Sequence, residues 1–216
     1  EQNYKINLPN MFKELNYKNP NHYIIKKGLF IRDFENLYKN IKDPWNQHKN
    51  FLKEETIMLA KEIIKNISKN KNELSLLDVG AGQGSLKKIL KSNIKYLGTD
   101  IHKKKIKNVK FDDINIYNSS FKNKFDIIVC FKTIYYLGDN IDIVINNFKN
   151  YLKKNGFIII SYNLKTSSYS NKFLTDLELR SKLVKSFKEI YTVEINRHIY
   201  ELKKEEKNTL FVFKKN

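Results

Sequence analysis

Short apolar segments rich in β-branched residues alternate along this chain with longer segments that have the apolar spacing of a helix. This alternation is typical of a parallel sheet built from βαβ units, because parallel strands need a crossover connection that is usually helical. Seven segments have the strand pattern: 74–79, 94–99, 109–111, 125–131, 157–162, 189–195 and 209–213. The apolar spacing predicts helices over 54–68, 142–152 and 173–187, and Gly156 is expected to stop the second of them.

The length of 216 residues is suitable for one α/β domain with a short appended segment. Residues 1–50 have no strand pattern and are rich in Asn, Tyr and Pro. We therefore expect a helical or irregular N-terminal lid over 1–50 and a sheet domain over 51–216. A packing extension without a lid function is an equal alternative for 1–50.

A glycine-rich loop follows the first expected strand, where residues 78–84 read Asp-Val-Gly-Ala-Gly-Gln-Gly. Glycines let the backbone turn tightly and let a ligand approach it closely. A P-loop would continue with Gly-Lys-Ser/Thr, and a dinucleotide-binding loop would have a glycine where Ser85 stands. A carboxylate at the tip of the strand would repel a pyrophosphate, so Asp78 favours a ligand with a cationic centre.

Acidic residues also stand at the ends of the next two expected strands. Asp100 follows segment 94–99, where a carboxylate can accept hydrogen bonds from both hydroxyls of a ribose. Asp113, followed by the apolar Ile114, is preferred over Asp112 as an acceptor for the amine of adenine. For any one of these aspartates alone, a helix cap or a solvated turn is an equal alternative. Their order after the same loop favours an adenosyl ligand.

The order of these motifs resembles that of the class I SAM-dependent methyltransferases over residues 50–216. The similar segments are the loop 77–84, Gly98-Thr-Asp100, the Asp-Ile pair at 113 and 114, and the strand segments 125–130 and 152–161. The resemblance implies a Rossmann-like α/β fold with one seven-stranded sheet, in which the last strand is antiparallel and lies between its two predecessors. It also implies S-adenosyl-L-methionine (SAM) as the methyl donor and S-adenosyl-L-homocysteine (SAH) as its product.

The same resemblance implies which residues hold the donor. The loop backbone from Gly80 to Gly84 would hold its methionine part, Asp100 its ribose and Asp113 its adenine. The full expected set of cofactor-binding residues is Asp78, Gly80, Ala81, Gly82, Gln83, Gly84, Asp100, Ile101, Asp112, Asp113, Ile114 and Phe131.

The resemblance places the methyl acceptor over the end of the fourth strand, where residues 130–137 read Cys-Phe-Lys-Thr-Ile-Tyr-Tyr-Leu. Many relatives have a histidine where Tyr136 stands, which argues against a histidine base at that position. Tyr135 and Tyr136 are candidates to orient the acceptor, although a core position is the alternative for one of them. Lys132 suggests an anionic acceptor, with an unspecific surface lysine as the alternative.

Two residues of the expected lid are further candidates for the acceptor site. His48 is the candidate base and Trp45 a candidate acceptor contact. A surface role is the alternative for His48.

The acceptor is expected to be small, because only one helix-sized connection separates the fifth and sixth expected strands. Residues 131–134 lack the Asn/Asp-Pro-Pro-Tyr motif, which argues against adenine N6, cytosine N4 and glutamine as targets. We favour O-methylation of a sugar, a nucleotide-sugar, or a phosphoramidate or phosphate-type group in surface-glycan or capsule biosynthesis. N-methylation of a small molecule, an RNA or protein methyltransferase with a lysine-rich docking face, and a non-catalytic accessory subunit are the alternatives.

The net charge of +18 arises almost entirely from lysines. Only Arg32, Arg180 and Arg197 are arginines among 41 basic residues, and the lysines are spread through every segment. Proteins that read phosphates or bases tend to use the bidentate arginine fork, so solvated lysines are preferred here over a nucleic-acid interface.

The remaining features indicate a metal-free cytoplasmic protein. The single cysteine, Cys130, lies in an apolar run and is expected to be a small buried apolar residue in a reducing compartment. His22, His48, His102 and His198 show no metal-ligand spacing. No window resembles a membrane span, and residues 1–5 lack the apolar core of a signal peptide. We expect a monomer or a homodimer.

Overall fold

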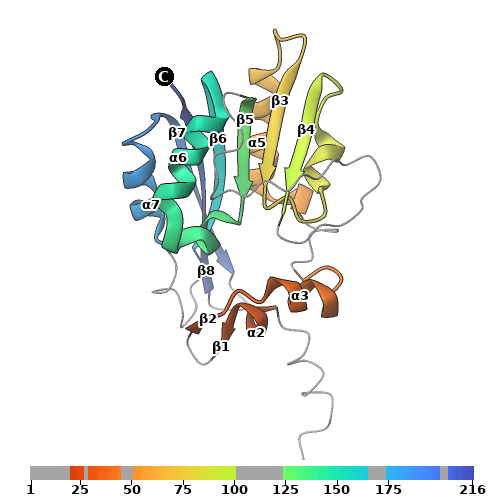
Figure 1. Cartoon of the computed structure of the whole chain (residues 1–216), viewed down its shortest axis with the longest axis vertical. Coiled ribbons are helices and arrows are strands. Elements are labelled where there is room, and N and C mark those ends of the chain that lie inside the picture. The colour runs from red at the N-terminus through yellow and green to blue at the C-terminus, as the bar shows by residue number, and fades with distance from the viewer. Residues whose placement is uncertain (1–19, 27–28, 45–50, 101–123, 165–173, 200–203) are drawn as a thin grey trace, which may run out of the picture.

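The computed structural model describes residues 20–26, 29–44, 51–100, 124–164, 174–199 and 204–216. Its centre is a mixed six-stranded sheet with the order β4-β3-β5-β6-β8-β7 (Figure 1). The strands are β3 (Leu74–Val79), β4 (Ile94–Thr99), β5 (Phe125–Phe131), β6 (Leu152–Leu164), β7 (Lys188–Ile199) and β8 (Lys204–Lys214). The seventh expected strand, 109–111, lies outside the described residues.

The first four of these strands in sheet order are parallel, and β8 is antiparallel to both of its neighbours, β6 and β7. The last strand in the chain thus enters the sheet between its two predecessors. This confirms the direction and the place that the sequence resemblance implied for the last strand.

Helices cover both faces of the sheet: α5 (Glu55–Ile67) lies behind it in Figure 1, and α6 (Ile141–Tyr151) and α7 (Asp176–Leu183) lie in front. Because strand side chains alternate between faces, each buried strand supplies both cores. Leu76 and Ile127 belong to the core under α5, whereas Leu77 and Ile128 belong to the core under α6 and α7. The continuous apolar runs in these strands follow from this two-sided burial.

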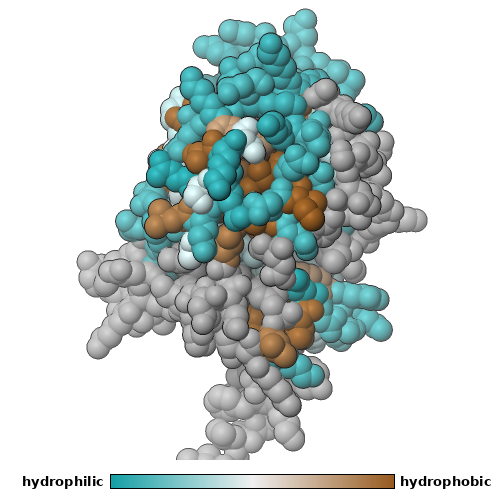
Figure 2. Space-filling view, turned by 60° about the vertical axis from the view of Figure 1, so that its left-hand side comes forward, coloured by the Kyte–Doolittle hydropathy of each residue, from teal (hydrophilic) through white to brown (hydrophobic). Residues whose placement is uncertain are grey.

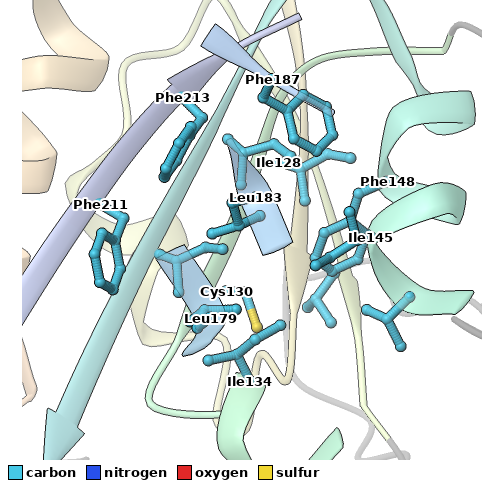
Figure 3. Close-up of a cluster of buried hydrophobic side chains, with 14 of the residues drawn as sticks. Ile128, Cys130, Ile134, Ile145, Phe148, Leu179, Leu183, Phe187, Phe211 and Phe213 are labelled. Atoms are coloured by element: carbon cyan, nitrogen blue, oxygen red, sulfur yellow. The ribbon is translucent and has the colours of Figure 1, made fainter. Parts of the chain in front are cut away.

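The core under α6 and α7 contains the single cysteine. Figure 3 shows the sulfur of Cys130 among Ile134, Leu179 and other apolar side chains from the sheet and both helices. The thiol is free and fully buried, and burial raises its pKa. Its expected place as a small buried apolar residue is therefore confirmed.

The end of α6 differs from the expectation. The helix ends at Tyr151, and Leu152 already pairs with Phe125 as the first residue of β6. Gly156 lies inside that strand and was wrong as a helix stop. A Cβ on Gly156 would lie 2.9 Å from Cδ2 of Leu152, so close packing is the structural reason for a glycine here.

The other expected helices are shorter than their apolar patterns. Helix α7 begins at Asp176 because Thr175 forms a capping box with Glu178, in which the hydroxyl accepts from the Glu178 amide and the carboxylate accepts from the Thr175 amide. After the glycine loop the chain forms only a 3-10 helix, η2 (Ser85–Ile89), before β4.

The N-terminal segment contains α2 (Asn21–Ile24), a small hairpin of β1 (Ile25–Lys26) and β2 (Leu29–Phe30), and α3 (Phe34–Asn40). The hairpin is a correction, because no strand was expected before residue 51. Figure 1 shows these elements beyond the carboxyl ends of β3, β4 and β5. Their function as a lid stays a prediction.

Among the coloured residues of Figure 2, polar ones predominate on this face, and apolar residues show between them in smaller areas. In the part of the chain that the structure describes, no helix combines the length and the apolar character needed to cross a membrane.

Candidate active site

The glycine loop follows β3, the strand at which the order of the strands reverses. Strand β3 has β4 on one side and β5 on the other, so the carboxyl end of β3 borders the crevice in which open α/β sheets bind ligands. The loop contains Gly80, Gly82 and Gly84 with φ values of 73°, 53° and 64°. Residues with a side chain rarely adopt this left-handed backbone conformation, so the path of the loop requires all three glycines.

Backbone hydrogen bonds join this loop to the end of β4. The amides of Gly80 and Ala81 donate to the carbonyl of Thr99 at 2.9 and 3.0 Å. The amide of Gly82 donates to Oδ2 of Asp100 at 2.8 Å. The loop and the acid at the end of β4 therefore form one unit, which brings together the two motifs most expected to hold a cofactor.

Asp78 is buried at the end of β3 and accepts a hydrogen bond from the hydroxyl of Tyr96 at 2.7 Å. The pKa of Asp78 is raised to about 7. Burial is the largest cause, the hydrogen bond from Tyr96 opposes it, and the negative charge of Asp100 adds to it. The carboxyl group is therefore poised to gain or lose a proton near neutral pH.

The glycine loop also touches the segment after β5. A Cβ on Gly80 would lie within 2.7 Å of Cβ of Thr133 and would overlap the rest of that side chain. The Thr133 hydroxyl in turn donates to the carbonyl of Phe131 at 3.0 Å. The absence of a side chain at Gly80 thus lets the ends of β3 and β5 come close together.

Lys132 has an unusual backbone at the end of β5, with a φ of 51°. Its amide donates to the carbonyl of Ser161 at 3.0 Å and to the Ser161 hydroxyl at 3.1 Å. Its ammonium forms an ion pair with Glu54, the N-cap residue of α5, and both side chains are about 70% buried. The ion pair compensates the positive charge from which an anionic acceptor was expected.

The two tyrosines after Lys132 lie in η3 (Ile134–Asn140) and have different surroundings. Tyr135 is buried in the core under α6 and packs against Tyr136 and Tyr162, with ring centroids 4.4 and 5.7 Å away. The ring of Tyr136 packs against the ring of Phe34 in the N-terminal segment, with ring centroids 5.3 Å apart. Burial raises the pKa of Tyr136 to about 12, so its phenol stays protonated at neutral pH.

The N-terminal segment contacts both sides of this region. Phe34 packs edge-on against Tyr136 after β5, and the side-chain amide of Gln83 in the glycine loop donates to the carbonyl of Lys42 at 3.2 Å. Phe51, just before α5, packs against Phe131 with ring centroids 6.3 Å apart. The contacts of Phe34 and Lys42 hold the N-terminal segment across the carboxyl ends of β3 and β5.

Several predicted site residues lie outside the described part of the chain: Trp45, His48, Ile101, Asp112, Asp113 and Ile114. Their roles stay predictions. Within the described residues, no cluster of three His, Cys, Asp or Glu side chains could hold a metal ion.

Three residues of this region, Tyr96, Glu54 and Thr133, were not among the predicted site residues. The signal for Tyr96 is a hydroxyl-bearing residue inside a buried strand, two positions before Gly98. Glu54 and Thr133 have no comparable signal, because their partners are distant in sequence and depend on how the elements pack.

A family model described as a methyltransferase domain matches residues 50–208 of this chain. No curated protein matches the sequence. Many solved structures are similar to this chain in fold.

The chain is similar to the N-methyltransferase NodS from Bradyrhizobium japonicum, solved with SAH, with a TM-score of 0.60 at 15% identity over 80% of this chain and 92% of the other. A putative sarcosine dimethylglycine methyltransferase from Galdieria sulphuraria gives 0.57 at 11% identity, over 74% and 86%. The [4+2]-cyclase SpnF gives 0.58 at 12% identity, over 73% and 80%.

At these identities the structures demonstrate a shared fold, and the cyclase shows that this fold also serves other chemistry. The family match, the sheet order and the joined loop and acid agree with one another. The chain belongs to the methyltransferase-domain family, with the fold of the class I SAM-dependent methyltransferases.

Proposed function

We propose that this chain transfers the methyl group of SAM to a small acceptor bound at the carboxyl end of β5. The observation that carries the proposal is the hydrogen bond between the Gly82 amide and Asp100. It fixes an acid beside a loop whose three glycines have left-handed backbones, and this arrangement suits a ligand with a ribose and an amine.

The residues present suit this methyl donor. The backbone from Gly80 to Gly84 turns through three left-handed glycines, which a ligand can approach closely, and Asp100 offers carboxylate oxygens for ribose hydroxyls. Asp113 is the proposed partner of the adenine. When bound, SAM supplies an electrophilic methyl group on a sulfonium. Because displacement at that methyl is in line, the contribution of the chain is to hold the acceptor in position.

The proposed acceptor site lies between η3 and the N-terminal segment. Tyr136 stands there with a protonated phenol, which can donate a hydrogen bond to an acceptor oxygen and orient it. Trp45 and His48 are the proposed contacts from the adjoining part of the N-terminal segment. The contacts of Phe34 and Gln83 that hold this segment across the strand ends support a small acceptor.

We propose an anionic acceptor, with O-methylation of a sugar or a phosphate-type group in glycan biosynthesis as its most specific form. The support is the net charge of +18, whose field attracts anions to the molecule as a whole. The ion pair with Glu54 means that Lys132 supplies this attraction only if the pair opens.

To test this proposal, methyl-labelled SAM and the purified protein are added to a cell extract, one half of which has been treated with nuclease. The products are separated by size and then by anion exchange. The expected label is in small molecules retained by the anion exchanger, and it should be lost with an Asp100→Ala variant. Label in protein or RNA would overturn the small acceptor. Label in small neutral or cationic molecules would overturn only the anionic class.

A further inference from the structure

The buried hydrogen bond between Tyr96 and Asp78 connects β4 to the residues at the start of the glycine loop. Tyr96 is 8% exposed and Asp78 is 3% exposed. The Tyr96 hydroxyl donates to Oδ2 of Asp78 at 2.7 Å. Asp78 is separated from the loop glycine Gly80 by one residue, so the position of its carboxylate depends on a side chain that lies on a different strand.

The register of the sheet explains how the two groups meet. In the parallel pair, Leu76 lies beside Tyr96 and Asp78 lies beside Gly98, so all four positions face the side of the sheet covered by α5. Gly98 has no side chain to occupy the space beside Asp78. The long Tyr96 side chain can therefore extend over Gly98 and place its hydroxyl on the carboxylate.

Few charged groups act on this carboxyl. Among the described residues, the titratable groups that interact with it are Tyr96 in β4, Asp100 directly after β4, and the Cys130 thiol in β5. Burial raises the pKa of both the Tyr96 phenol and the Cys130 thiol, so each stays neutral. Asp100 is negative and opposes ionisation of Asp78, whereas the hydrogen bond from Tyr96 favours it.

We propose that Tyr96 is a positioning residue for the methyl donor: its hydroxyl favours the ionised form of the Asp78 carboxyl, and donor binding completes this ionisation by releasing the proton from the molecules in which Asp78 is still protonated. This inference rests on the proposed function, because the amine that SAM and SAH share is the cation that favours the ionised carboxylate. A Tyr96 with a merely structural role would not alter how binding depends on pH.

The experiment measures the Kd of SAH by calorimetry from pH 6 to pH 9 for the wild type, Tyr96→Phe and Asp78→Asn. In the wild type the affinity should fall as the pH drops below about 7. Tyr96→Phe should bind about tenfold more weakly at pH 7 and shift the fall to a higher pH, because the ionised carboxylate has lost its donor. Asp78→Asn should remove this part of the pH dependence. The titration of the ligand amine is common to all three proteins and cancels in the comparison.

Tyr151→Phe is the matched control, because Tyr151 is a buried tyrosine on α6 in the other core. It should keep the wild-type dependence of the SAH affinity on pH.

If Tyr96→Phe does not fold, proton release on SAH binding is compared between the wild type and Asp78→Asn in buffers of different ionisation enthalpy. The wild type should then release more protons at pH 7. An unchanged profile in Tyr96→Phe, or equal proton release, would overturn the inference while leaving methyl transfer intact. A wild type that binds no SAH at any pH would overturn the proposed function itself.

Discussion

The side chain of Thr133 packs directly against the α-carbon of Gly80, so the segment after β5 fills the space that any larger residue at position 80 would need. This contact sets the distance between the cofactor loop and the proposed acceptor site. It also means that the glycine has two requirements to meet, a φ of 73° and the absence of a Cβ.

Gly80→Ala should therefore lower both stability and donor affinity. The added methyl group would overlap Thr133 and be strained at a positive φ, so we expect a loss of about 2 to 4 kcal/mol in the free energy of unfolding. The Kd for SAH should rise by at least about tenfold, because the loop must move. Urea unfolding and calorimetry measure the two effects. Thr133→Ala in the Gly80→Ala background should recover part of the stability, because it removes the two Thr133 atoms nearest to the added methyl group, and no recovery would contradict the packing explanation.

Asp78→Asn should stabilise the protein at alkaline pH. An aspartate in an unfolded chain titrates near a pKa of about 3.9, whereas in the folded chain the pKa of Asp78 is about 7. Between these values the folded state binds more protons, so the stability contributed by this group falls as the pH rises from about 4 to 7. The variant should be more stable than the wild type by about 1 to 4 kcal/mol at pH 8, with a smaller difference near pH 4.

Urea unfolding at both pH values checks this expectation, with Asp142→Asn as the control. Asp142 is largely exposed, with 76% of its side-chain area accessible. A stability difference for Asp78→Asn that is the same at pH 4 and pH 8 would show that the buried carboxyl does not titrate as described.

Lys132 should tolerate glycine better than alanine. Both substitutions remove the ion pair with Glu54, so its contribution cancels when the two variants are compared. Glycine relieves the left-handed backbone at φ 51°, whereas alanine retains that strain. Lys132→Gly should therefore be more stable than Lys132→Ala by about 1 kcal/mol in urea unfolding. Equal stabilities would indicate that the backbone at this position relaxes when the lysine is removed.

Asp126 should contribute more to stability than an ordinary surface acid. Its Oδ2 accepts from the amide and the hydroxyl of Ser75, both at 2.9 Å, and from the Lys153 ammonium at 2.8 Å. Burial alone would raise the pKa of Asp126, but the hydrogen bonds from Lys153 and Ser75 outweigh it and lower the pKa. Asp126→Ala should cost about 1 to 3 kcal/mol at pH 7 by urea unfolding, because it leaves the partly buried Ser75 amide without this acceptor.

Asp142→Ala is again the control. It should lower the free energy of unfolding by less than about 0.5 kcal/mol, because the Asp142 carboxylate is exposed and its ion pair with Lys182 is screened by solvent. Because the pKa of Asp126 is lowered, the stability that it contributes is present at neutral pH and is lost as the pH falls through that pKa. A loss for Asp126→Ala no larger than that of Asp142→Ala would contradict the network.

The central strands could be predicted from the sequence to the residue. Strands β3, β4 and β5 have the expected bounds, because both of their faces are buried and their apolar runs end where burial ends. Strands β7 and β8 extend well past their apolar segments as a polar hairpin. Ion pairs such as those of Lys207 with Asp176 and Glu194 stabilise its middle, and a pattern of apolar residues cannot reveal such pairs.

The candidate site was predictable where one segment defines it. The glycine loop and Asp100 could be found because local backbone needs and the end of a strand fix them. Tyr96 and Glu54 could not, because the first depends on the register between β3 and β4 and the second on how α5 packs on the sheet. The ion pair of Lys132 could not be predicted for the same reason, since its partner Glu54 is 78 residues away in the sequence.

Calorimetric titration of the purified protein with SAH, beside Asp100→Ala and Asp142→Ala, tests the central claim most directly. The wild type should show saturable binding, Asp142→Ala should bind equally well, and Asp100→Ala should bind more weakly by about 1.5 to 3 kcal/mol, because the ribose and the Gly82 amide both lose a charged partner. Absence of saturable binding in the wild type, or unchanged affinity in Asp100→Ala, would contradict the assignment of this loop and acid as the donor site.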